Sequence, residues 1–145
     1  MNAGTGLSGG GSSGSVTLSI NTAVTADLTT AQTLTNKTLT SPLIDIGINP
    51  KTAAYTTLAT DDGKLITVTS SSTANITLAA SLYNVGSQIT IARMGLGAVS
   101  IVGDTGVTVV STGATASTPA LRAQYSTATA VMLSANSWLV MGDIS

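Results

Sequence analysis

The residues most able to do chemistry in this 145-residue chain are its acids, all of which are aspartates. They are Asp27, Asp45, Asp61, Asp62, Asp104 and Asp143. Two carboxylates held about 5–10 Å apart could hydrolyse a glycosidic bond. However, Asp61-Asp62-Gly63 and Gly103-Asp104-Thr105-Gly106 have the composition of turns, where aspartate accepts hydrogen bonds from the local backbone. We therefore predict a turn role for these aspartates, with a cation site and catalysis as weaker alternatives, since the D-x-D-x-D-G calcium spacing is missing.

Other reactive side chains are scarce. The chain has no His and no Cys, which removes the usual zinc ligands, thiolate chemistry and the imidazole base of most nucleophilic triads. Gly4, Gly6 and Gly9 match the dinucleotide fingerprint G-x-G-x-x-G. That motif requires a strand before it and a helix after it, whereas more Gly and Ser follow here. The sequence therefore predicts no enzyme, no bound metal and no cofactor.

Aromatic residues offer a different chemistry, because a ring can stack on a sugar. Trp138 lies in the apolar run Ser137-Trp-Leu-Val-Met141, so we expect it to anchor a core or a subunit contact. Tyr83 and Tyr125 lie beside turn residues. They are the better candidates for an exposed recognition surface.

The composition favours β structure and a surface shared with other subunits. Apolar residues make up 43 % of the chain, there is no Phe, and Val, Ile and Thr are plentiful. These β-branched residues favour strands. Only 8 % of residues are charged, against about 25 % in ordinary soluble domains. We therefore expect other subunits to cover part of the surface.

The charge pattern and hydropathy also limit the partners. The five basic residues are scattered, so they form no footprint for nucleic acid. No apolar run approaches the roughly 20 residues of a membrane span. The first residues lack the basic region and apolar core of a secretory signal. We predict neither nucleic-acid binding nor membrane insertion.

Residues 43–145 show strand signals at short intervals. Short apolar runs that recur every 8–12 residues with Gly-rich turns between them are typical of a sandwich, jelly roll or barrel. We therefore predict an all-β chain whose C-terminal part, residues 43–145, is a small antiparallel β-sandwich or jelly-roll-like module. The predicted strands cover residues 43–48, 64–69, 75–78, 88–92, 98–102, 107–110, 121–125, 130–133 and 138–141.

Residues 1–42 form an extended arm rich in Gly, Ser and Thr. Residues 1–15 have a linker composition, and residues 16–20 alternate as a short strand does. Further along, Leu28, Leu34 and Leu39 fit neither a helical nor a strand period. Wound with other copies of itself, the arm could bury these leucines around a shared axis. We predict that they serve oligomerisation.

The stretch Thr33-Leu-Thr-Asn-Lys-Thr-Leu-Thr-Ser-Pro42 carries the sharpest resemblance in the chain. It is similar to a segment of fibre-like virion proteins of tailed bacteriophages. In those proteins it lies between a Gly/Ser/Thr-rich region and a β-rich module, which is the order here. The runs D-G-K-L-I at 62–66, G-S-Q-I-T-I at 86–91, G-V-T-V at 106–109 and S-W-L-V-M-G at 137–142 resemble their C-terminal modules.

The resemblance implies a homotrimeric structural protein of the virion, and it carries over no catalytic residue. Such a protein would be a short fibre, cement or decoration protein, attached to capsid or tail proteins through its N-terminal arm. The alternative is a tail-fibre module that binds a receptor or a glycan on the host surface. On either reading the central stretch is where three chains would meet.

Overall fold

The computed structural model describes residues 7–10, 14, 15, 17–20, 38, 40–112 and 117–145. The chain divides into two compact units, Met1–Leu43 and Ile44–Ser145. This division lies one residue from the boundary predicted between residues 42 and 43.

In the first unit, two short strands pair with each other. Strand β1 (Leu7–Gly9) lies antiparallel to β2 (Leu18–Ile20), with Leu7 opposite Ile20. A side chain at Gly9, whose φ is +98°, would meet the Thr17 carbonyl oxygen at 2.3 Å, so glycine is required there. The expected strand over residues 16–20 is present in part. The leucines at positions 28, 34 and 39 lie outside the described residues.

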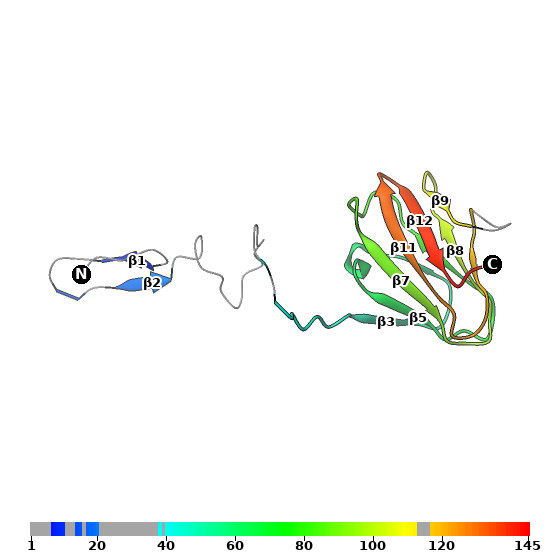
Figure 1. Ribbon diagram of the computed structural model, residues 1–145, viewed down its shortest axis with the longest axis horizontal. Helices are drawn as coiled ribbons and strands as arrows, with labels where there is room; N and C mark the ends of the chain where they lie inside the picture. Colours follow the sequence, from blue (N-terminus) through cyan, green and yellow to red (C-terminus); the bar gives the residue numbers. More distant parts are fainter. Residues whose placement is uncertain (1–6, 11–13, 16, 21–37, 39, 113–116) are drawn as a thin grey trace. The chain divides into compact units, whose positions relative to one another are not determined.

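The second unit contains a six-stranded and a four-stranded sheet (Figure 1). Their orders are β3-β5-β7-β11-β12-β9 and β10-β8-β6-β4. The strands are β3 (Ile48–Lys51), β4 (Tyr55–Thr56), β5 (Leu65–Val68), β6 (Ala74–Leu78), β7 (Gln88–Arg93), β8 (Val99–Gly103), β9 (Thr108–Val110), β10 (Ala120–Leu121), β11 (Thr127–Ser134) and β12 (Ser137–Gly142).

The described residues contain one short 3₁₀ helix, η1 (Ala59–Asp61), and no α-helix, which confirms the all-β prediction. None of their helices is long and apolar enough to cross a membrane.

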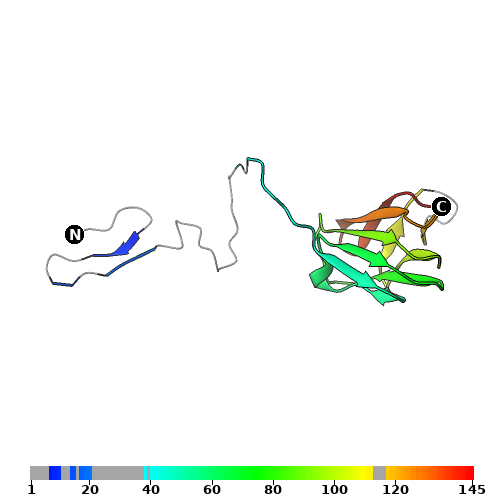
Figure 2. The same cartoon turned by 90° about the horizontal axis from the view of Figure 1, so that it is seen from below.

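The chain winds as a solenoid through three coils. It passes from β3 to β4, from β5 to β6 and from β7 to β8, changing sheet each time. Equivalent strands of successive coils therefore pair in parallel: β3 with β5 and β5 with β7 in one sheet, and β4 with β6 and β6 with β8 in the other. Figure 2 shows the coils stacked in colour order, from blue-green through green, with the orange and red strands beyond them. The hairpin β11–β12 then continues the six-stranded sheet in antiparallel fashion.

The predicted antiparallel sandwich or jelly roll is therefore wrong. The strand spacing and the Gly turns agree with the prediction. However, most turns carry the chain to the other sheet instead of back along the neighbouring strand of the same sheet. The turn at residues 103–106, for example, looks like a hairpin in the sequence. It connects β8 in the four-stranded sheet to β9, which pairs in parallel with β12 in the other sheet.

The first strand of this unit also differs from its prediction. The apolar run of residues 43–48 was expected to be the strand and to stop before Asn49-Pro50. In the structure β3 begins at Ile48 and contains both of those residues. Proline is tolerated because β3 is the edge strand, where its missing N–H breaks no ladder.

Glycines allow the corners of two coils to stack in direct backbone contact. Gly97 N–H donates to the Ser70 carbonyl at 2.9 Å, and Met94 N–H donates to the Val68 carbonyl at 2.8 Å. A Cβ atom on Gly97 would lie 2.0 Å from the Ser72 carbonyl oxygen. The corner after β7 can therefore lie on the corner after β5 only if this position has no side chain.

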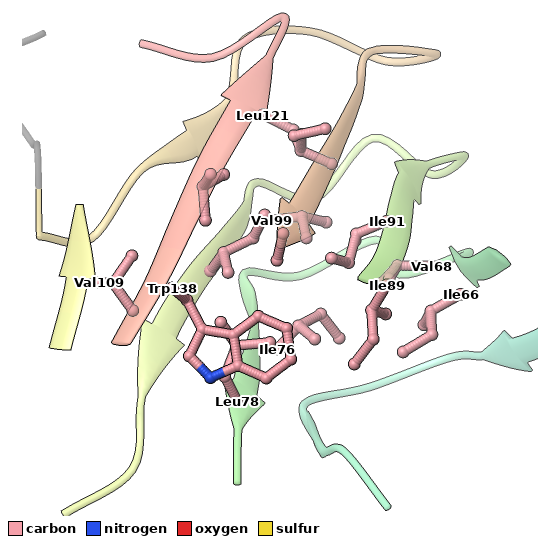
Figure 3. Packing of buried hydrophobic residues seen from close by; sticks show 14 of the residues in the cluster. Ile66, Val68, Ile76, Leu78, Ile89, Ile91, Val99, Val109, Leu121 and Trp138 are labelled. Atoms are coloured by element: carbon pink, nitrogen blue, oxygen red, sulfur yellow. The ribbon is translucent and has the colours of Figure 1, made fainter. Parts of the chain in front are cut away.

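The core lies between the two sheets (Figure 3). Ile and Val from alternate strand positions fill it, as expected when one face of each strand is buried. The indole of Trp138 is fully buried and meets the Tyr83 ring edge-to-face, with centroids 5.1 Å apart. This confirms the core interpretation of Trp138.

Candidate interaction surface

Asp61 and Asp104 accept hydrogen bonds from the local backbone, as predicted, whereas the carboxylate of Asp62 bonds to the start of β7, far away in the chain. The Asp61 carboxylate accepts from Leu58 N–H at 2.9 Å, Asp62 from Gln88 N–H at 3.1 Å, and Asp104 from Thr105 N–H at 2.7 Å. Within the described ranges, no group of three or more His, Cys, Asp or Glu side chains could hold a metal ion.

Asp61 is the centre of a buried polar cluster at the first coil. Its carboxylate accepts from the Asn49 amide at 2.7 Å, the Tyr55 hydroxyl at 2.8 Å and Leu58 N–H. Burial by itself raises the pKa of the Asp61 carboxyl, but these donors, led by Leu58 N–H, bring it below its usual value. Burial and the neighbouring carboxylate raise the pKa of Tyr55.

The register explains why this cluster is polar. Asn49 in β3 is paired with Ile66 in β5, which in turn is paired with Ile91 in β7. The inward position of the first coil therefore carries an amide where later coils carry isoleucine. Since β3 and β4 are both edge strands, the cluster closes that end of the module. Its hydrogen bonds join β3, β4 and η1.

This cluster should make stability depend on pH. A carboxyl whose pKa is lower in the folded state stabilises the protein above its unfolded pKa of about 4, and this contribution is lost as the pH falls through the folded pKa. We expect Asp61→Asn to flatten the decline in the free energy of unfolding below pH 4. Asp61→Ala should cost about 2–3 kcal/mol at pH 7, because buried donors lose their acceptor. Urea unfolding of the three proteins at pH 7 and at stepwise lower pH measures both effects.

Asp143 provides the control for that experiment. Its carboxyl is exposed, and the Ser126 hydroxyl and the Arg122 guanidinium lower its pKa. Its contribution to the free energy of unfolding is therefore also lost in acid, and this contribution remains in the Asp61→Asn protein. An Asp61→Asn protein with the pH slope of the wild type would show that the Asp61 cluster contributes nothing to the acid sensitivity.

The outward side of the six-stranded sheet, here called the outer face, is a surface without charged side chains. Strand register defines it as three cross-strand rows. The rows are Ile48, Leu65, Thr90, Thr129 and Met141; Gln88, Val131, Leu139 and Val110; and Pro50, Thr67, Ala92 and Thr127. None of these side chains is charged, and the Thr90 and Thr129 hydroxyls bond to each other at 3.0 Å.

Large apolar side chains of the outer face remain in contact with solvent. Ile48 is 65 % exposed and Met141 is 48 % exposed. The preceding segment adds Ile44 and Ile46, which are 75 % and 65 % exposed. The two isoleucines and part of the outer face line an open groove of about 520 Å³, whose rim includes Lys64. The lining residues from the face are Ile48, Leu65, Thr90 and Thr129.

The outward side of the four-stranded sheet is different. Its outward positions are small and mostly polar: Thr56, Asn75, Thr77, Ser100, Val102 and Ala120. None of the exposed large apolar residues belongs to these positions. The two sides of the module therefore differ in hydrophobicity, and the outer face is the candidate contact surface.

A second candidate is the corner around Tyr125. This tyrosine is 68 % exposed and has φ +69°, which is unfavourable for a residue with a side chain. Its N–H donates to the Arg93 carbonyl at 2.6 Å, and the neighbouring Gln124 amide donates to the Met94 carbonyl at 2.8 Å. Exposed Leu96 lies on the same corner, where its carbonyl accepts from the Arg93 guanidinium at 2.6 Å.

The two tyrosines proposed for recognition have different environments. Tyr83 is half-buried, and its hydroxyl donates to the Leu58 carbonyl at 2.6 Å. Burial raises the pKa of the Tyr83 hydroxyl. Of the pair, Tyr125 is the ring presented to solvent.

The loop that holds Tyr125 was predicted to be a strand over residues 121–125, which is wrong beyond Leu121. Strand β10 ends there, and the Ser126 hydroxyl accepts from Ala123 N–H at 3.0 Å and donates to Asp143 at 2.6 Å. These bonds turn the chain into β11.

Sequence reasoning did not identify the outer face. Its signal is present in residues 127–133, Thr-Ala-Thr-Ala-Val-Met-Leu, where neither side of the strand carries a charge. A strand with apolar or small residues on both sides indicates that both sides are covered. The pairing register was needed to join this strand to its neighbours.

Comparison with protein-family models, with curated proteins and with solved structures finds no match for this chain.

Proposed function

We propose that the chain is a non-enzymatic structural subunit of a bacteriophage virion, a short fibre, cement or decoration protein that assembles as a homotrimer. Its N-terminal arm, residues 1–42, attaches it to capsid or tail proteins. The observation that carries the proposal is the uncharged outer face, because a surface of exposed Ile and Met favours association. The resemblance of residues 33–42 to phage fibre-like proteins supplies the biological setting.

The charge content supports assembly as well. With 8 % charged residues, a free monomer would have little charge to keep it apart from its neighbours. The module is also small, so subunit contacts would add the buried surface that a chain of this size lacks.

The direct test is the mass of the full-length protein in solution. Light scattering should give three times the 14.3 kDa chain mass. Leu34→Ala combined with Leu39→Ala should weaken the trimer and leave the strand signal of the second unit unchanged, because truncating a packed leucine costs about 2–5 kcal/mol and each change occurs in all three chains. A stable wild-type monomer contradicts the proposed assembly.

The Tyr125 corner favours a second candidate function, a receptor-binding or glycan-binding module of a tail fibre. An exposed ring on a hydrogen-bonded corner can stack on a sugar, and its strained backbone conformation is a feature often found at functional sites. Binding to host cells or a glycan array that Tyr125→Ala abolishes would favour this alternative. Equal binding by both proteins would count against it.

A further inference from the structure

We infer that copies of this chain pack against one another through the outer face of the six-stranded sheet, with the segment of residues 44–48 forming one border of the contact. The occupant of the face is a second copy of the same module. The inference rests on the self-assembly part of the proposed function and adds the surface that performs it.

The outer face has the properties of a covered sheet. An antiparallel or mixed sheet that faces water usually carries polar and charged side chains on that side. Here the central row joins Ile48, Leu65, Thr90, Thr129 and Met141 without a charge. At the far edge, Val110 in β9 is 41 % exposed.

The lack of charge on the outer face favours another copy of the chain as its partner. A strongly acidic or basic partner would bury its own charges against this face without any counter-charge. The outer face of a second copy has no charges to bury, so the outer faces of neighbouring copies can meet around a three-fold axis without leaving a charge unpaired. The hydroxyls of Thr90 and Thr129 bond to each other, which reduces the cost of removing them from water.

The size of the contact explains the part played by residues 44–48. Six strands about 4.8 Å apart, with a mean length of about 17 Å, present roughly 500 Å² of flat area. A stable interface buries about 800 Å² per partner. Ile44, Ile46 and Ile48 occupy alternate positions and line the groove beside the face. Their exposed surface therefore increases the area available for the contact and brings it closer to about 800 Å² per partner.

A matched pair of charge insertions tests the surface. Thr129→Lys places a cation in the middle of the outer face, whereas Thr77→Lys places one on the outward side of the four-stranded sheet. Both threonines are half-buried and outward-facing. Sedimentation velocity over a dilution series of full-length protein should show association weakened at least about 100-fold by Thr129→Lys and unchanged by Thr77→Lys, since like charges brought together across a contact repel strongly.

A second pair is available in which the substituted side chain is already exposed, so folding is not at risk. Ile48→Lys changes the edge of the face, and Val85→Lys changes a loop residue with almost the same exposure, 67 % against 65 %. Ile48→Lys should weaken association and Val85→Lys should not. Circular dichroism confirms that each variant is folded.

The outcomes separate the two proposals. Wild-type protein that stays monomeric overturns the proposed assembly and this inference together. Wild-type protein that associates, while Ile48→Lys and any folded Thr129→Lys associate equally well, overturns only the inference. Selective loss in the outer-face variants supports it.

Discussion

Replacing Trp138 by alanine is expected to lower the free energy of unfolding of the β module by about 3–5 kcal/mol. The indole is fully buried between the sheets and belongs to the same hydrophobic cluster as Ile76 and Leu78 (Figure 3). Alanine would remove most of that contact, leave a cavity and end the edge-to-face contact with Tyr83. Native domains are stable by only about 5–15 kcal/mol, so the loss is a large part of the total.

Urea unfolding followed by far-UV circular dichroism measures this effect. Fluorescence is unsuitable because Trp138 is the only tryptophan. Trp138→Phe is the control: it keeps an aromatic ring and removes the indole N–H, which has no hydrogen-bond partner among the described residues. We expect it to cost less than half as much. A loss below about 1 kcal/mol for Trp138→Ala would contradict the burial of this side chain.

Replacing Gly97 by alanine is expected to cost about 3 kcal/mol or more. The new methyl group would meet backbone atoms of Ser72, at 2.0 Å for the carbonyl oxygen, and backbone cannot move aside as a flexible side chain can. Relief of the clash requires the two corners to separate. That separation would break the hydrogen bond from Gly97 N–H to the Ser70 carbonyl.

Gly106→Ala is the matched control for Gly97→Ala. Gly106 has φ +78° with open space around it, so alanine there meets only the backbone penalty of about 1 kcal/mol. Urea unfolding should show a much larger loss in the free energy of unfolding for Gly97→Ala than for Gly106→Ala. If Gly106→Ala were the more destabilising of the two, close stacking of the coils at the corner of residues 94–97 would not be a main determinant of the module's stability.

Most strands of the module could be predicted from the sequence because their causes are local. The runs at 64–69, 75–78, 88–92 and 98–102 combine β-branched residues with a two-residue period, and β5, β6, β7 and β8 lie within one or two residues of them. The burial of Trp138 was also predictable from its apolar run. The hydrogen bonds of Asp61 and Asp104 to the backbone of their own turns follow from equally local chemistry.

Strand pairing was not predictable, because it depends on where each turn sends the chain. Gly-rich turns fit both a hairpin and the corner of a coil. The choice was decided by long-range contacts such as Gly97 on Ser70, which link residues of different coils. Pro50 likewise looked like the end of a strand, and only its place on the edge of the sheet made it acceptable within β3.

The sequence by itself determined the β composition, the low charge and the recurring strands, while tertiary structure decided which surfaces those features create. Tyr83 and Tyr125 have similar surroundings in the sequence. In the structure Tyr83 packs against Trp138 and is half-buried, whereas Tyr125 is exposed to solvent. The outer face exists only because the register aligns uncharged positions of six strands. The physical reason is that a side chain's exposure depends on the neighbours that pairing brings to it, and those neighbours lie far away in the chain.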